Sequence, residues 1–422
     1  CTVGIIGLGY VGLPLAVELA LGRFHVTGFD VDAWKVSELN AGRSYIPDVK
    51  SEDLAKVVAS GHFRATTDMS SLAEMDCIDI AVPTPLRKTK DPDMSYVVQA
   101  VEAVRQHLRK GQLVSLESTT YPGTTDELVK PMLEETGLKA GQDFYLAFSP
   151  ERVDPANPQY LTKDIPKVVG GFDKASTDIA CALYGAVVTK TVPVSSTVVA
   201  EMAKLLENTF RSVNIGMVNE LALMCHRMKI DVWEVIDAAR TKPFGFMPFY
   251  PGPGLGGHCI PIDPFYLAWK AREFDVVSRF IETAGEVNRS MPHWVVERTM
   301  QAFSRRGRGL AGARILVVGL AYKKNVDDAR ESPSYKLMEL LEAEGVEVSY
   351  HDPYVPVIPK SREYAHFMGR ESVDLARAGD FDAVLVATDH DAIDWDGLLA
   401  RARLVVDTRG VYRAPSDKVV RA

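Results

Sequence analysis

The chain has 422 residues, of which 46% are hydrophobic and 25% charged, and a formal net charge of −8; this composition is typical of a globular protein with two or three domains. The 48 basic residues are scattered rather than clustered, so nucleic acid and anionic membranes are not expected as partners. No apolar run approaches the roughly 20 residues that span a bilayer, no secretory leader is expected, and the five cysteines lack metal-site or disulfide spacing, so a reduced, cytosolic protein without a metal site is expected.

The first thirty residues carry a dinucleotide-binding pattern. A β-branched run at 2–6 leads into G-L-G-Y-V-G, a helix-forming stretch at 13–21 and a strand at 25–29 that ends at Asp30. Glycines at this spacing let a pyrophosphate approach the backbone, and the acid accepts hydrogen bonds from the adenosine ribose. Because Asp30 disfavours a 2′-phosphate, the pattern predicts NAD rather than NADP. The residues expected at the cofactor are Gly7, Gly9, Tyr10, Val11, Gly12 and Asp30, together with Lys35, which is alternatively a solvated helix residue.

Three further strands are predicted to end in polar residues at one rim of the same sheet. The apolar runs at 77–82, 113–116 and 144–148 precede Thr84, Thr119 and Glu151 in turn. Cofactor contacts gather at the carboxyl ends of parallel strands, and a carboxylate there could act as a general base on water. Each of these residues, taken singly, is also typical of a turn or a helix cap.

The segment from Ser195 to about Ala239 is long, helical in pattern and free of internal proline. Glu201, Lys204, Asn208 and Arg211 recur at spacings of three, four and three, so they form one polar stripe. A solvated helix face is the common meaning of such a stripe. The apolar residues around it favour a mostly buried helix instead, and the stripe then indicates a cleft.

Residues 251–264 read P-G-P-G-L-G-G-H-C-I-P-I-D-P, a glycine-rich loop that contains one cysteine. Such a loop can be approached closely by a ligand or by another backbone. Pro261 is predicted to be the first residue of the next helix, with Asp263 in its first turn. Cys259 would then lie just before a helix N-terminus, which favours its thiolate. The alternative is a buried structural cysteine in a turn.

A second α/β unit is predicted after the basic connector at 305–309. Strands at 314–318, 346–350, 383–387 and 404–406 alternate with helical stretches, and no full G-x-G-x-x-G is present. This unit is expected to bind a phosphate compound other than a dinucleotide.

These motifs resemble the nucleotide-sugar 6-dehydrogenases over essentially the whole chain. The resemblance rests on G-L-G-Y-V-G-L-P at Gly7, E-S-T-T-Y-P-G-T-T at Glu117, S-P-E-R at Ser149 and K-x-x-x-N at Lys204. It continues in G-G-H-C-I-P-x-D-P at Gly256, A-Y-K-K-N-x-D-D-x-R-E-S-P-S at Ala321 and D-T-R-G at Asp407. It implies two Rossmann-like α/β domains joined by a central helical domain with a long helix: 1–195 for NAD, 196–304 for dimerisation and catalysis, and 305–422 for the UDP-sugar.

The resemblance also implies a four-electron oxidation of the sugar C6 alcohol by NAD. Cys259 is expected to form a thiohemiacetal and then a thioester, while Lys204 and Asn208 stabilise the C6 oxygen. Asp263 is expected to hold and deprotonate a water beside Lys204 that serves as a base in the alcohol oxidation, and Glu151 and Thr119 to position the water that hydrolyses the thioester. Arg330 is expected to reach the cofactor from the C-terminal domain. The residues expected at the substrate are Glu151, Arg152, Lys204, Asn208, Arg211, Tyr250, Gly252, Gly256, His258, Lys323 and Arg409.

His258 before the cysteine and Arg152 after the glutamate make the chain similar to the branch that oxidises UDP-N-acetylhexosamines. UDP-N-acetyl-D-glucosamine (UDP-GlcNAc) is the expected substrate, a homodimer the expected assembly, and polysaccharide or O-antigen synthesis the expected pathway. UDP-N-acetylmannosamine (UDP-ManNAc) and UDP-glucose stay open as alternatives. A two-electron β-hydroxyacid dehydrogenase and a non-catalytic UDP-sugar sensor are more remote ones.

Overall fold

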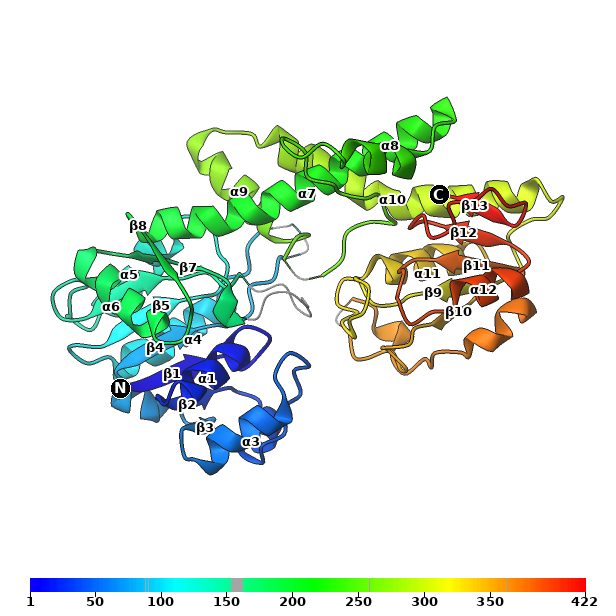
Figure 1. Ribbon diagram of the computed structural model, residues 1–422. Helices are drawn as coiled ribbons and strands as arrows, with labels where there is room; N and C mark the ends of the chain where they lie inside the picture. The colour runs from blue at the N-terminus through cyan, green and yellow to red at the C-terminus, as the bar shows by residue number, and fades with distance from the viewer. Residues whose placement is uncertain (88, 90, 153–161, 258, 362) are drawn as a thin grey trace. The chain divides into compact units, whose positions relative to one another are not determined.

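The computed structural model describes residues 1–422 except 88, 90, 153–161, 258 and 362. The chain divides into two units, one made of Cys1–Glu207 and Phe265–Val276, the other of Asn208–Pro264 and Val277–Ala422. Each unit contains one β-sheet, and Figure 1 traces both along the chain. No helix in the described part of the chain is both long and apolar enough to cross a membrane.

The first unit is built on an eight-stranded sheet. Its strands are β1 (Thr2–Ile6), β2 (His25–Phe29), β3 (Phe63–Thr66), β4 (Cys77–Ile80), β5 (Leu113–Leu116), β6 (Tyr145–Phe148), β7 (Lys167–Gly171) and β8 (Thr191–Val194). They follow the order β3-β2-β1-β4-β5-β6-β7-β8, and all neighbours are parallel except β6 and β7. The chain order reverses beside β1, and doubly wound sheets bind nucleotides at such a point.

Helices cover both faces of this sheet, because successive side chains of its strands point to opposite sides. Val3 and Ile5 of β1 are buried in one apolar cluster and Ile6 in another. The predicted doubly wound α/β architecture is therefore confirmed. The helices of this unit are α1 (Gly12–Leu21), α2 (Ala33–Asn40), α3 (Ser51–Ala59), α4 (Ser95–His107), α5 (Lys130–Glu134) and α6 (Lys174–Gly185), with most of α9 (Asp263–Ala271).

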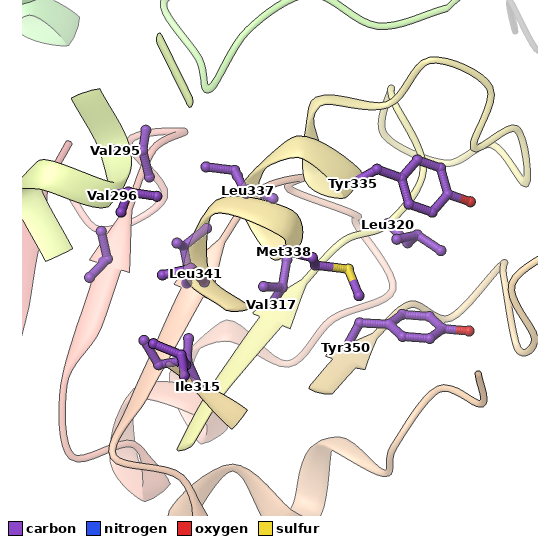
Figure 2. Packing of buried hydrophobic residues seen from close by; sticks show 14 of the residues in the cluster. Val295, Val296, Ile315, Val317, Leu320, Tyr335, Leu337, Met338, Leu341 and Tyr350 are labelled. Atoms are coloured by element: carbon purple, nitrogen blue, oxygen red, sulfur yellow. The ribbon is translucent and has the colours of Figure 1, made fainter. Parts of the chain in front are cut away.

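The second unit contains a five-stranded parallel sheet of order β10-β9-β11-β12-β13. Its strands are β9 (Arg314–Val318), β10 (Glu347–His351), β11 (Ala383–Val386), β12 (Val405–Asp407) and β13 (Val419–Arg421), and its helices are α8 (Val232–Ala239), α10 (Arg279–Ser304), α11 (Pro333–Ala343) and α12 (Trp395–Arg401). Leu337, Met338 and Leu341 of α11 lie in one apolar cluster with Val317 of β9 and with Val295 and Val296 of α10 (Figure 2). The long helix α10 thus shares its core with the sheet.

The helix α7 (Thr197–Met228) is the longest in the described chain, and it belongs to both units. The sequence predicted one helical stretch as far as Ala239, which is wrong. Lys229 has a left-handed φ of 60°, and the N–H of Ile230 bonds back to the carbonyl of Cys225, so the helix ends there. Asp231 then caps α8 by accepting from the N–H groups of Trp233 and Glu234.

Two other local predictions differ from the structure. The helix after the cysteine loop begins at Asp263 rather than at Pro261, because the carbonyl of Cys259 accepts from the N–H groups of Ile262 and Asp263 in a preceding turn. The strands β3, β7, β8 and β13 were not predicted. They are short, β7 ends in two glycines, and β8 contains Pro193, so none shows a strong strand pattern.

Candidate active site

The turn from Gly7 to Gly12 joins β1 to α1 and is sterically suited to a pyrophosphate. A Cβ on Gly7 would lie 2.6 Å from the carbonyl oxygen of Ala81, and one on Gly12 would collide with the carbonyl oxygen of Gly7. A Cβ on Gly9, by contrast, would meet no atom within 4 Å. The middle glycine therefore faces open space at the start of a helix, as close approach of a phosphate requires. Tyr10 and Val11 lie in the turn beside it.

Asp30 is held against this turn at the end of β2. It is buried, and its Oδ2 accepts from the N–H of Leu8 at 3.0 Å and lies 3.2 Å from Nζ of Lys35. Its Oδ1 accepts from the N–H of Asp32 at 3.0 Å. The acid is thus fixed beside the glycine turn, where an adenosine ribose would lie, and the residues present fit NAD.

We expect Asp30→Ala to raise the KM for NAD about ten-fold or more, because the ribose hydroxyls lose a charged acceptor. The same change removes the repulsion of a 2′-phosphate, so the preference for NAD over NADP should fall. Steady-state kinetics with each cofactor measure both effects. Asp32→Ala is the matched control, since Asp32 caps α2 two residues away. An unchanged KM for NAD in Asp30→Ala would contradict the assignment.

The three polar residues predicted at one rim follow strands that are neighbours. The strands β4, β5 and β6 are adjacent and parallel, so they end at the same edge of the sheet. Thr84 beyond β4 is buried, whereas Thr119 beyond β5 and Glu151 beyond β6 are half-buried. The polar edge is therefore confirmed, while the role of each residue stays a prediction.

A buried lysine that the sequence analysis missed lies beside Glu151. Nζ of Lys167 on β7 is 2.9 Å from Oε1 of Glu117 and 3.8 Å from Oε2 of Glu151. Burial opposes the charge of Lys167, but Glu117 and Glu151 outweigh it and the pKa of the lysine is raised. Burial raises the pKa of Glu117 and that of Asp79, whose Oδ1 accepts from the hydroxyl of Tyr184 at 2.7 Å. Only the three-dimensional pairing of β7 with β6 reveals this cluster.

The polar stripe on α7 divides into parts with different surroundings. Glu201 does not line a cleft: its carboxylate accepts from the N–H groups of Gly123 and Thr125, and from the hydroxyl of Thr125 at 2.7 Å. It therefore anchors the loop after β5. Lys204 is 8% exposed and makes no ion pair with a described residue, and Arg211 is exposed. Of the four residues of the stripe, Glu201 therefore has a structural role.

Asn208, one helical turn beyond Lys204, contacts the start of α9. Its Nδ2 donates to Oδ2 of Asp263 at 2.6 Å, and both side chains are buried. The N–H of Asp263 in turn donates to the carbonyl of Cys259 at 2.8 Å. The second unit therefore links the cysteine backbone, Asp263 and Asn208 through two consecutive hydrogen bonds. Cys259 itself is exposed, and His258 lies outside the described residues.

The glycine-rich loop is anchored by two asparagines that the sequence analysis did not single out. Oδ1 of Asn219 on α7 accepts from the N–H of Gly252 at 3.0 Å, and its Nδ2 donates to Oδ1 of Asn288 on α10 at 2.8 Å. All these groups are buried. Because buried amides are costly to leave unpaired, this chain of bonds holds the loop to both helices.

The same loop packs closely on the C-terminal sheet. A Cβ on Gly252 would lie 2.5 Å from Nη1 of Arg409, and one on Gly256 would lie 2.5 Å from Cβ of Tyr322. The N–H of Gly257 donates to the carbonyl of Arg330 at 3.1 Å. The glycines thus allow contacts that no side chain would permit.

Three of the remaining predicted residues, Tyr250, Arg330 and Arg152, contact a carboxylate of the protein. Tyr250 donates its hydroxyl to Asp237 at 2.7 Å, and Lys323 is half-buried. Arg330 is paired with Asp328 at 2.7 Å. In the first unit, Arg152 is paired with Glu207 at 2.6 Å.

The C-terminal sheet also has an acid at the end of its second strand, Asp352. Asp352 follows β10 as Asp30 follows β2, but its Oδ2 accepts from the N–H groups of Leu320 and Ala321 and lies 3.1 Å from Nε2 of His390. Although burial opposes it, the His390 contact and these hydrogen bonds lower the pKa of Asp352. Asp30 also accepts hydrogen bonds from its own loop, so what distinguishes Asp352 is the buried His390 beside it. Among described residues, no group of three His, Cys, Asp or Glu side chains could hold a metal ion.

The fold and these loops define a dehydrogenase that combines an NAD site with a second nucleotide-binding sheet. The chain belongs to the UDP-glucose/GDP-mannose dehydrogenase family: the NAD binding domain of that family matches residues 1–188, its central domain 198–290 and its UDP binding domain 316–414. The protein is therefore an NAD-dependent UDP-sugar dehydrogenase.

Individual relatives cover nearly the whole chain. It is 36% identical to UDP-N-acetyl-D-glucosamine 6-dehydrogenase of Pseudomonas aeruginosa over 92% of this chain and 90% of that protein. It is 35% identical to NDP-N-acetyl-D-galactosaminuronic acid dehydrogenase of Ralstonia nicotianae over 98% of this chain and 96% of that protein. The crystal structure of a UDP-D-ManNAc dehydrogenase from Pyrococcus horikoshii superposes with a TM-score of 0.89 at 32% identity, covering 100% of this chain and 98% of that one.

Proposed function

We propose that the protein oxidises the C6 alcohol of a UDP-N-acetylhexosamine, with UDP-GlcNAc as the substrate, to the uronic acid. The observation that carries this proposal is the link from Cys259 through Asp263 to Asn208, with Lys204 one helical turn away on α7. Cys259 and Asp263, on the loop that leads into α9, supply a nucleophile and a carboxylate. Asn208 and Lys204, on α7, supply an amide and an ammonium group. Two molecules of NAD, bound in succession at the glycine turn, would accept the two hydrides that C6 loses.

In the first oxidation, Lys204 and Asn208 act on the C6 oxygen. A water held by Asp263 takes the hydroxyl proton and passes a proton to that carboxylate, while the Lys204 ammonium and the Asn208 amide donate hydrogen bonds to the same oxygen. The hydrogen bond between Asn208 and Asp263 fixes the orientation of the amide. The product of this half-reaction is the C6 aldehyde.

In the second oxidation, Cys259 retains that aldehyde. Its thiolate forms a C–S bond to C6 as the aldehyde oxygen takes a proton, which gives a thiohemiacetal. Loss of a hydride from C6 and of the hydroxyl proton converts it into a thioester. Glu151, positioned with Thr119 and 3.8 Å from Nζ of Lys167, takes a proton from the water that hydrolyses the thioester and releases Cys259.

Substrate and cofactor contacts are proposed for the remaining polar residues. Lys323 and Arg409 would hold the diphosphate of the UDP-sugar on the C-terminal sheet, where Arg409 packs on Gly252. Arg330 would reach the cofactor. The domains would span 1–195 for NAD, 196–304 for dimerisation and catalysis, and 305–422 for the UDP-sugar. The sugar pocket would be completed by Arg152, Arg211, Tyr250, Gly252, Gly256 and His258.

The choice of UDP-GlcNAc is supported by the resemblance to the Pseudomonas aeruginosa enzyme, and the product would serve polysaccharide synthesis. Values of kcat/KM for UDP-GlcNAc, UDP-ManNAc, UDP-glucose and UDP-galactose test this choice. We expect a preference of at least about a hundred-fold for UDP-GlcNAc over UDP-glucose and UDP-galactose, because a pocket built to bond the N-acetyl group is left unpaired by sugars that lack it. The preference over UDP-ManNAc, which carries the same group at C2 in the opposite configuration, should be smaller. A higher value for UDP-ManNAc would reassign the substrate while leaving the reaction unchanged.

We further propose a homodimer through the central helix. Leu206, Met217 and Met228 of α7 are 62%, 52% and 67% exposed. A row of large apolar side chains on a long helix is typical of a protein interface. We expect sedimentation to show a dimer in the native protein and a monomer in the double variant Leu206→Glu, Met217→Glu. A native monomer would contradict this proposal.

A further inference from the structure

The second unit contains a cavity that is separate in sequence and in composition from the catalytic candidates. It has a volume of about 390 Å³ and is formed by the C-terminal end of α7, the start of α8, one side of α10 and the residues of β13. The lining on α7 begins at Ala222, fourteen residues after Asn208, which corresponds to roughly 20 Å along the helix. None of the residues assigned above to NAD, UDP-sugar or catalysis lines it.

The charges that line the cavity are mostly positive. Lys229, Arg298, Arg305 and Arg421 share the lining with the carboxylate of Asp231 and with Ala422, the last of the 422 residues, so cations outnumber carboxylates even when a terminal carboxylate is counted. Arg421 and Asp231 form an ion pair with each other. The other three cations have no ion pair with any residue that the structure describes, so the cavity carries an uncompensated positive charge.

Among these cations, Arg298 gives the strongest support for an anion site, because its side chain is buried and only 4% exposed. Its Nη1 donates to Oε1 of Gln301 at 2.5 Å and its Nη2 reaches the carbonyl of Arg421 at 3.5 Å, while its buried Nε has no partner in the described structure. Burial lowers the pKa of Arg298, and the charge of Arg305 lowers it further. A buried guanidinium without a carboxylate is costly, and a bound anion would remove that cost.

Two aromatic residues give the cavity a second unpaired donor and a flat wall. The indole Nε1 of Trp233 is buried and has no hydrogen-bond partner among the described residues. The ring of Trp294 lies 5.1 Å from that of His226, and the guanidinium carbon of Arg298 is 5.8 Å from the Trp294 ring. Two buried donors, one neutral and one charged, therefore line one basic cavity.

We propose that this cavity binds a small phosphate-bearing anion. Arg298 and Arg305 supply the charge, Trp233 donates its indole N–H, and Lys229 adds a cation at the rim. Several cations on one small cavity favour a multiply charged group such as phosphate over a single carboxylate. Because its walls come from α7, α8, α10 and β13, a bound anion would fasten the helical segment to the edge of the C-terminal sheet.

Calorimetric titration of the full chain with inorganic phosphate, at constant ionic strength, tests the proposal. We expect the dissociation constant for phosphate to rise about ten-fold or more in both Arg305→Gln and Arg298→Gln, because each loses a charge-assisted hydrogen bond. Arg305 is exposed, so its variant should keep the fold even if the buried Arg298 variant does not. Arg227→Gln is the matched control, since Arg227 is an exposed arginine of α7 that does not line the cavity.

Phosphate that binds at the UDP-sugar site contributes equally to all three variants, so their difference isolates the cavity. The control should bind phosphate as the native chain does. Equal dissociation constants in the native chain and Arg305→Gln, or no phosphate binding at all, would overturn the proposal. Unaltered UDP-sugar oxidation in Arg305→Gln would show that any loss of phosphate binding is not a loss of fold.

Discussion

Cys259→Ser is expected to bind NAD and UDP-sugar almost as the native enzyme does and to lose at least about a thousand-fold in steady-state turnover. Cys259 is exposed and its backbone is fixed by the turn into α9, so serine fits without repacking. A serine hydroxyl is a far weaker nucleophile at neutral pH than a cysteine thiolate, and no thioester can form. NADH absorbance measures turnover, and equilibrium titration measures the binding of each ligand.

Cys181→Ser is the control for the chemistry of the substitution. Cys181 lies on α6 and is only half-buried, so this variant should keep native turnover. Native turnover in Cys259→Ser would show that the reaction needs no covalent intermediate. Equal losses in both variants would indicate damage to the fold rather than to the chemistry.

Lys204→Ala is expected to lower kcat by about a hundred- to a thousand-fold with a much smaller change in KM. The lysine lies one turn from Asn208 on α7 and, unlike other buried lysines, has no carboxylate partner in the described structure. Its charge is therefore available for the oxygen of the substrate as that oxygen loses its proton. Steady-state kinetics with a thermal melt on the same sample separate loss of chemistry from loss of fold.

Lys270→Ala provides the contrast for this prediction. Lys270 is also buried, but its Nζ lies 2.6 Å from both Glu127 and Glu273. Its removal leaves these carboxylates without their cation, so the melting temperature should fall while kcat is retained. If Lys204→Ala instead unfolds the protein and Lys270→Ala stops turnover, the roles assigned to the two lysines are wrong.

Sequence reasoning succeeded where local residue order decides the structure. The turn from Gly7 to Gly12 and the strand that ends at Asp30 were found because their spacing is dictated by one ligand and one local geometry. The adjacency of β4, β5 and β6 could also be expected, since successive parallel strands in such sheets are commonly neighbours.

It failed where the deciding contact is distant in the chain. Lys167 gains its place beside Glu117 only because β7 reverses direction and pairs with β6. Asn219 and Asn288 are ordinary helix residues in the sequence, and only the crossing of α7 and α10 makes them anchors of the cysteine loop. Glu201 shared the spacing of the polar stripe, yet its carboxylate accepts from N–H groups of a loop 76 to 78 residues earlier in the chain.

Counting the NADH formed per molecule of UDP-GlcNAc shows whether one enzyme removes four electrons from C6 of one UDP-sugar. With limiting UDP-GlcNAc and excess NAD, we expect two NADH per molecule of UDP-GlcNAc, and the UDP-linked uronic acid as the only sugar product. One NADH per sugar, with the aldehyde released, would contradict both the thioester and the part assigned to Cys259.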